Sequence, residues 1–120
     1  MIAGLTLGLV VYMLGSISGA HVNPAVTIGL ASIGKISWME ACYYVLSQLI
    51  GGFLAFLAGG VLLGGPLPVV ADSTLLIAIA EALGAAILVL GVSSVVHGKA
   101  PHDAAGLTIG TALTLGAFAA

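Results

Sequence analysis

Hydrophobic residues fill this chain in long stretches that carry almost no charge and are separated by short polar breaks. The apolar stretches cover residues 1–17, 38–64, 74–96 and 104–120. Each approaches or exceeds the roughly 20 apolar residues that a helix needs to cross the hydrocarbon core of a bilayer. The breaks hold turn-forming Gly and Pro residues. The pattern predicts an all-α membrane protein with several crossings.

Residues 18–34 depart from this pattern, because polar and helix-starting residues crowd together there. Asn is a favoured N-cap and Pro suits the first helical position, so Asn23 and Pro24 predict the start of a helix. Gly34 is its expected end. About ten residues give a helix of roughly 15 Å, which is half the thickness of the hydrocarbon core. We therefore expect a re-entrant half-helix.

The start of a half-helix at mid-membrane can act on small solutes. Free N–H groups and the helix dipole place partial positive charge there, which repels cations. If the Asn23 side-chain oxygen caps the helix, its NH₂ group remains as a donor, and the carbonyls of Gly19, Ala20 and His21 supply acceptors. The simpler readings are that Asn23 is only a cap and that His21 is a packed histidine that fixes the loop.

The stretch Ser18-Gly-Ala-His-Val-Asn-Pro-Ala-Val-Thr-Ile-Gly29 resembles the first signature loop of the aquaporin and aquaglyceroporin family, the major intrinsic proteins. Trp38-x-x-Ala41, Ser47-Gln48-x-x-Gly51-Gly52 and Glu81 agree with the flanking pattern of that family. The resemblance covers residues 1–120 and implies an aquaporin-like helix bundle. It further implies a passive channel for water or small neutral solutes such as glycerol, in which Asn23, Pro24 and Ala25 line the pore.

The resemblance also implies that the chain is partial and lacks the first span, the second NPA loop and the last span of the family. It implies a homotetramer for the full-length protein, in the plasma or inner membrane. Lys35 and Lys99 lie in alternate connections, and the positive-inside rule makes that side cytoplasmic. The span at residues 1–17 then runs from outside to inside, which predicts an earlier span.

Residues 3–8, Ala-Gly-Leu-Thr-Leu-Gly, recur at 105–110 as Ala-Gly-Leu-Thr-Ile-Gly. An odd number of crossings separates the copies, so we expect them to run in opposite directions, as in inverted repeats. A second half-helix is then expected soon after position 120. Glycines at four-residue spacing permit close helix contact. The helix-packing glycines that we predict are Gly4, Gly8, Gly51, Gly52, Gly106 and Gly110.

Two polar residues fall inside predicted spans. Glu81 lies about 10 Å into its span, a depth at which an ionisable residue suggests a functional site. The family resemblance implies that Glu81 accepts hydrogen bonds from a signature loop. We interpret Gln48 in a similar way, as a polar residue that makes contacts inside the helix bundle. The alternative is an ion- or proton-coupled transporter with Glu81 as the coupling carboxylate. A third reading is a non-conducting structural membrane subunit.

In the family, a constriction draws one residue from the span before the first NPA loop and one from the fifth span. Those positions correspond here to Ala3 and Ala117. Both are small, where water-selective members commonly have an aromatic residue and a His. The resemblance therefore implies an opening wider than that of a water-only filter.

Composition agrees with a membrane protein: 61% of residues are hydrophobic and 5% are charged. A net charge of −2 with two basic residues argues against nucleic-acid binding. We expect no enzyme activity, because Ser18 and His21 have no acidic partner in the loop, and we expect no cofactor or metal site. A single cysteine, Cys42, is expected to be a small buried residue.

Overall fold

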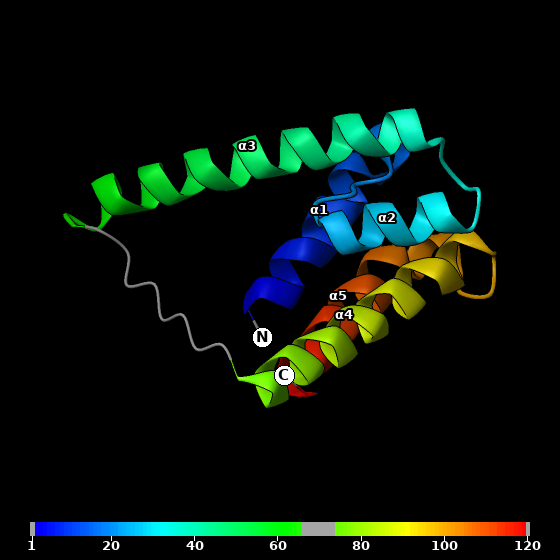
Figure 1. The fold of residues 1–120 in the computed structure, drawn as a ribbon. Helices are drawn as coiled ribbons and strands as arrows, with labels where there is room; N and C mark the ends of the chain where they lie inside the picture. The colour runs from blue at the N-terminus through cyan, green and yellow to red at the C-terminus, as the bar shows by residue number, and fades with distance from the viewer. Residues whose placement is uncertain (1, 66–73, 120) are drawn as a thin grey trace. The chain divides into compact units, whose positions relative to one another are not determined.

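The computed structural model describes residues 2–65 and 74–119, and all regular structure in these ranges is helical. The chain divides into two compact units (Figure 1). The first unit comprises residues 1–21 and 73–120, and the second comprises residues 22–72. The loop predicted at residues 65–73 lies, beyond Gly65, outside the described residues.

The described part of the first unit contains three α-helices and one short 3-10 helix. These are α1 (Ile2–Ser18), α4 (Leu75–Val96), η1 (His102–Ala104) and α5 (Ala105–Ala119). Helix α5 packs against both α1 and α4, and Figure 1 shows α4 and α5 running side by side. The buried hydrophobic side chains of these helices are Leu7, Val11, Leu88, Val92, Val95, Ile109 and Ala112.

Glycines allow α1 and α5 to touch backbone to backbone. A Cβ atom placed on Gly8 would lie 2.8 Å from the carbonyl oxygen of Gly106, and one on Gly4 would collide with the Gly110 carbonyl. Because Gly4 meets Gly110 and Gly8 meets Gly106, the two helices run in opposite directions. The opposite direction of the repeats is thereby confirmed, and the predicted small-residue contact is present at Gly4, Gly8, Gly106 and Gly110.

A second contact of the same kind joins α4 to α5. A Cβ on Gly84 would lie 2.8 Å from the Gly116 carbonyl oxygen, and one on Gly116 would lie 2.6 Å from the Gly84 carbonyl oxygen. In lipid, close approach of small residues replaces the hydrophobic effect as the reason for helix association. Helix α5 is therefore held on two faces by contacts that no larger residue would permit.

The second unit contains α2 (Pro24–Ser32) and α3 (Trp38–Leu62), which pack against each other. Helix α3 begins with a capping box: the Ser37 hydroxyl accepts from the Glu40 N–H, and the Glu40 carboxylate accepts from the Ser37 N–H at 2.8 Å. The spacing Ser-x-x-Glu is the sequence signature of this motif. It fixes the first residue of α3.

Three helices end in the same way, with a glycine in the left-handed region. Gly34, Gly64 and Gly98 have φ values of 73°, 73° and 66° and follow α2, α3 and α4. After α2, the Lys35 N–H donates to the Leu30 carbonyl and the Gly34 N–H donates to the Ala31 carbonyl. This pair of bonds is the Schellman motif, which satisfies the last carbonyls of a helix. The predicted end of the half-helix at Gly34 is confirmed.

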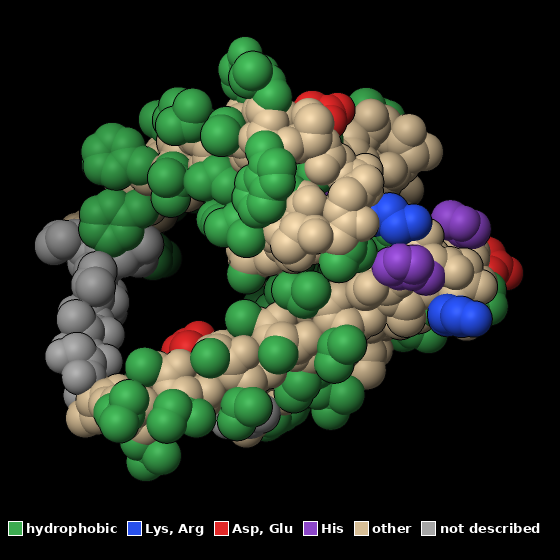
Figure 2. All heavy atoms as spheres, turned by 45° about the vertical axis from the view of Figure 1, so that its right-hand side comes forward, with side chains coloured by type: hydrophobic (Ala, Val, Ile, Leu, Met, Phe, Trp, Pro, Cys, Tyr) green, Lys and Arg blue, Asp and Glu red, His purple; other side chains and the backbone are tan. Residues whose placement is uncertain are grey.

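Helices α3 and α4 are long and apolar enough to cross a membrane, and α1 is a shorter apolar helix. Many large hydrophobic side chains are exposed on the chain, and Figure 2 shows them covering much of the visible surface, with few charged groups. An outward apolar surface suits helices surrounded by lipid, because lipid tails and hydrophobic side chains are equally apolar.

One expectation was wrong. Cys42 is exposed rather than buried, because the buried position of that turn of α3 is its neighbour Ala41 and successive residues of a helix point about 100° apart. The half-helix has nine residues, in agreement with the expected length of about ten. Helix α5 begins at Ala105, directly after the 3-10 turn His102–Ala104.

Candidate functional site

Asn23 caps α2 as its sequence predicted. Its backbone is extended (φ −138°, ψ 127°), and its side-chain oxygen accepts from the Ala25 N–H at 2.8 Å. Pro24 occupies the first helical position, where no N–H is needed. Because the atom that faces an N–H must be the oxygen, the NH₂ group of Asn23 points elsewhere and forms no hydrogen bond with the described residues. A fixed amide donor therefore stands at the start of a nine-residue helix.

The loop before this helix has an unusual backbone. Gly19 and Ala20 are both left-handed, with φ values of 74° and 53°, and Ala20 is the non-glycine residue with positive φ in the described chain. The Ser18 hydroxyl accepts from the Ala20 N–H at 3.3 Å, which supports this turn. Neither the Gly19 nor the Ala20 carbonyl accepts a hydrogen bond from described residues. These two carbonyls stay available as acceptors.

The His21 ring lies over Gly19. A Cβ placed on Gly19 would come within 2.9 Å of His21 Nε2 and 3.2 Å of Cδ2. The half-buried ring thus packs against the backbone of the turn, and only glycine leaves room for it. This contact fits the expected bracing role of the His21 side chain.

Gln48 and Thr27 connect α3 to the start of the half-helix. The Gln48 Nε2 atom donates to the Thr27 hydroxyl at 2.8 Å, and that hydroxyl donates to the Asn23 carbonyl at 3.3 Å. Thr27 is fully buried. Because buried polar groups are costly unless they are hydrogen-bonded, this chain of bonds favours one position of α2 on α3. The contact fits the expected role of Gln48 as a polar residue that joins helices.

For three other predicted residues, Glu81, Gly51 and Gly52, the structure shows no contact with described residues that supports the expected role. Glu81 is exposed on α4 and forms no hydrogen bond with described residues. Within the second unit, no atom lies within 4 Å of a Cβ placed on Gly51 or Gly52. The roles expected for these three residues stay predictions. Among the described residues, no group of His, Cys, Asp and Glu could hold a metal ion.

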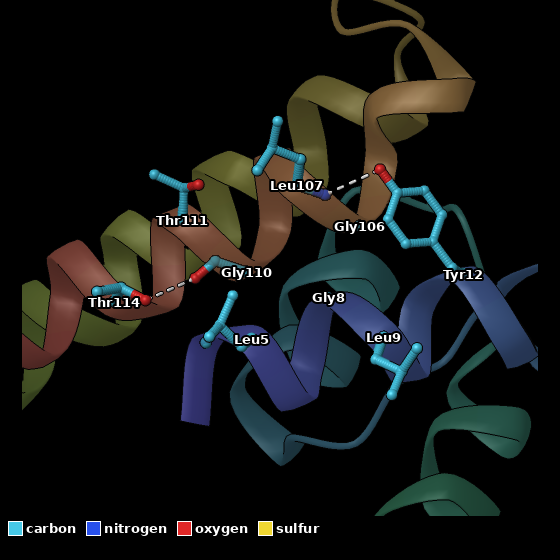
Figure 3. Close-up of a pocket in the computed structure, with 10 residues that line it drawn as sticks. Leu5, Gly8, Leu9, Tyr12, Gly106, Leu107, Gly110, Thr111 and Thr114 are labelled. Carbon is cyan, nitrogen blue, oxygen red and sulfur yellow. Dashed lines mark hydrogen bonds between the residues drawn. The ribbon is translucent and has the colours of Figure 1, made fainter. Parts of the chain in front are cut away.

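A groove of about 550 Å³ runs along the contact between α1 and α5 (Figure 3). Its walls are mostly apolar and include Leu5 and Leu9 from α1 and Leu107 and Thr111 from α5. These residues follow the contact glycines by one position. Ala3 instead precedes Gly4 and does not line the groove.

Ala117 lies three positions after the groove-lining residue Thr114 and is not itself part of the lining. Both alanines are exposed, and neither lines the groove. The groove is therefore distinct from the constriction that was predicted from Ala3 and Ala117.

Sequence reasoning missed Thr27, Tyr12 and the Ser37–Glu40 capping box. The capping box could have been found from its Ser-x-x-Glu spacing. Thr27 could have been found from its position within the loop at residues 18–29 that resembles the family signature. Tyr12 gives no local signal, because its hydrogen-bond partners, Asp103 and Leu107, lie about 90 residues further along the chain.

Comparison with known proteins supplies an independent view of the same residues. A family model described as Major intrinsic protein matches residues 1–120. The probable aquaporin AqpM of Archaeoglobus fulgidus is 40% identical over 129 aligned residues, covering 97% of this chain and 51% of the relative. Aquaporin AqpM of Methanothermobacter marburgensis is 35% identical over 120 residues, covering 89% of this chain and 48% of the relative.

A shorter region is more similar to another relative. The probable glycerol uptake facilitator protein of Thermotoga maritima is 53% identical over 51 residues, which is 42% of this chain and 22% of the relative. The chain spans about half the length of the AqpM proteins that it matches. No solved structure matches the chain significantly.

Proposed function

Since this chain belongs to the Major intrinsic protein family, we propose that it forms part of a passive transmembrane channel for water or small neutral solutes. Members of the family are channels rather than enzymes. Relatives are named aquaporins and a probable glycerol uptake facilitator, so both solute classes are represented among them.

The observation that carries this proposal is the capped start of α2. The Asn23 oxygen is committed to the Ala25 N–H, so the NH₂ group is presented as a donor of fixed direction. The carbonyls of Gly19 and Ala20, three or four residues earlier in the chain, are acceptors that no described residue uses. Donor and acceptors of this kind replace the water that a polar solute loses on leaving bulk solvent. We assign Asn23, Pro24, Ala25 and the carbonyls of residues 19–21 to the pore.

The finer assignments follow the same reasoning. Ala3 and Ala117 form part of the constriction, and their small side chains favour passage of solutes larger than water. Lys35 and Lys99 mark the cytoplasmic side. The full-length protein is a homotetramer in the cell membrane.

Flux measurements on the full-length protein that contains this chain test the proposal. Proteoliposomes should show osmotic permeability to water and glycerol above that of empty liposomes, with no dependence on an imposed proton gradient. Uptake that follows the proton gradient would instead support the coupled transporter. Permeability equal to that of empty liposomes would instead support the reading of the protein as a non-conducting structural subunit.

A further inference from the structure

The hydroxyl of Tyr12, near the middle of α1, is inserted into the first turn of α5. It donates to the carbonyl oxygen of Asp103 at 3.0 Å. It also accepts from the N–H of Leu107 at 3.3 Å, the bond drawn in Figure 3. Asp103 and Leu107 are four residues apart, which is the spacing of a direct α-helical hydrogen bond. The described residues form no direct bond between these two groups. The tyrosine hydroxyl thus occupies a place in the backbone ladder, as an inserted water does in other helices.

The aromatic ring of Tyr12 packs against α5 in addition to the hydrogen bonds of its hydroxyl. A Cβ on Gly106 would come within 2.5 Å of the ring atoms Cδ2 and Cε2, so the absence of a side chain at Gly106 makes the space that the ring fills. Tyr12 lies one helical turn beyond Gly8, which contacts the same glycine. The ring and hydroxyl together fix the N-terminal end of α5 relative to α1.

Small residues form the centre of the contact between α1 and α5. The backbones touch at Gly4, Gly8, Gly106 and Gly110, and the side chain of Thr114 lies against Gly4. Asp103 lies about 5 Å before Gly106 along α5, whereas Ala117 lies about 10 Å beyond Gly110. Because Gly116 is held against Gly84, a rotation about the glycine contact would carry α4 along with α5, and it would move Ala117 roughly twice as far as the end held by Tyr12.

We propose that Tyr12 is a positioning residue that sets the crossing angle of α1 and α5 and, through it, the separation of Ala3 and Ala117. This inference rests on the proposed function, in which the two alanines belong to the constriction. Removing the hydroxyl lets the Leu107 N–H bond directly to the Asp103 carbonyl, which closes the first turn of α5 and changes the direction in which that helix leaves η1. The width of the constriction changes with it.

The test uses Tyr12→Phe in the full-length protein, because this variant keeps the ring against Gly106 and loses only the hydroxyl. In proteoliposomes we expect the ratio of glycerol to water permeability to change by about threefold, equivalent to a barrier difference of roughly 0.6 kcal/mol. Tyr43→Phe is the matched control, since Tyr43 is exposed on α3. A role confined to stability would lower the amount of folded protein and leave the ratio unchanged.

A distance measurement tests the positioning step without relying on flux. Spin labels at Ala3→Cys and Ala117→Cys, in a Cys42→Ser background, should report a shifted distance when Tyr12→Phe is added and none with Tyr43→Phe. An unchanged distance and permeability ratio, or a Tyr12→Phe protein that does not fold, would overturn the inference. If the wild-type protein is no more permeable than empty liposomes, the channel proposal fails, and the spin-label distance alone decides whether Tyr12 sets the crossing.

Discussion

Gln48 on α3 donates a hydrogen bond to the hydroxyl of Thr27 on α2, with 2.8 Å between nitrogen and oxygen. The same hydroxyl donates to the carbonyl of Asn23, the residue that caps the half-helix. Thr27 is thereby both acceptor and donor at a fully buried position. The relation joins a full-length apolar helix to the first turn of a short one.

A double-mutant cycle measures the strength of this connection. Thr27→Val and Gln48→Met each keep side-chain volume and remove one partner. We expect a coupling free energy of about 0.5–1.5 kcal/mol in unfolding from mixed micelles, as for other buried hydrogen bonds. Ser47→Ala provides the control partner, because Ser47 bonds to the Tyr43 carbonyl on its own helix. Thr27→Val combined with Ser47→Ala should be additive, and additivity in the Gln48 cycle would contradict the prediction.

We expect the Asn23→Asp variant to fold and to have an altered permeability to neutral solutes and cations. Asp is a good N-cap and its charge suits the helix dipole, but it replaces the amide donor with an anionic acceptor. Loss of one hydrogen bond of about 0.5–1.5 kcal/mol lowers neutral-solute flux roughly two- to tenfold, and the negative charge admits cations. Stopped-flow permeability and liposome cation conductance are the measurements.

The matched control for this substitution is Thr74→Asp, because Thr74 caps α4 by accepting from the Ile77 N–H. It adds the same charge at another helix start and should cause no leak. Asn23→Asp channels with unaltered water permeability and no cation conductance would mean that Asn23 is only a cap.

Glu81→Gln distinguishes a structural acceptor from a titrating relay. If Glu81 accepts hydrogen bonds from a signature loop, the substitution lowers stability, since hydrogen bonds to charged groups contribute about 1.5–3 kcal/mol. Flux per folded channel should change little and gain no pH dependence. Glu40→Gln removes one negative charge from α3 instead and is the control for the flux measurement only, because it also weakens the bonds of the Glu40 carboxylate to Ser37. Wild-type flux that follows a proton gradient, and is lost in Glu81→Gln, would support coupled transport.

Gly8→Ala should destabilise the α1–α5 contact, because the added Cβ would lie 2.8 Å from the Gly106 carbonyl oxygen. Overpacking of this kind costs about 1–3 kcal/mol. Gly15→Ala, on the same helix, meets nothing closer than a Val11 methyl at 3.8 Å and should be neutral or stabilising by up to about 1 kcal/mol. Equal unfolding midpoints for Gly8→Ala and Gly15→Ala would contradict this prediction, because they would show that α1 and α5 can move apart at no cost in stability.

Local signals in the sequence were sufficient for features that depend on neighbouring residues. The start of α2 at Asn23 and Pro24 and its end at Gly34 follow from capping chemistry that acts within one helical turn. The repeat at residues 3–8 and 105–110 also predicted the antiparallel direction of α1 and α5, since topology alone determines it. These predictions needed no knowledge of packing.

Features that depend on the rotation of a helix were harder to predict. Cys42 was expected to be buried and is exposed, because a shift of one residue turns a side chain by about 100°. The contact of Gly84 with Gly116 has no matching repeat to reveal it. The Tyr12 hydroxyl reaches Asp103 and Leu107 only when α1 and α5 have one particular alignment along their axes. The periodicity of hydrophobic residues carries no information about that alignment.

The glycine contact between α1 and α5 also bears on how the protein is made. Gly8 and Gly106 are separated by about a hundred residues, so a ribosome working at 5–20 residues per second reaches α5 roughly 5–20 seconds after α1. During that interval α1 is in the membrane and α5 has not yet been synthesised. A face of glycines exposes no polar side chain to lipid during that interval, but it also lets another helix approach closely, and in lipid such close approach favours helix association. The residues that permit the closest contact in the finished fold are thus also those at which α1 can pair early with another helix.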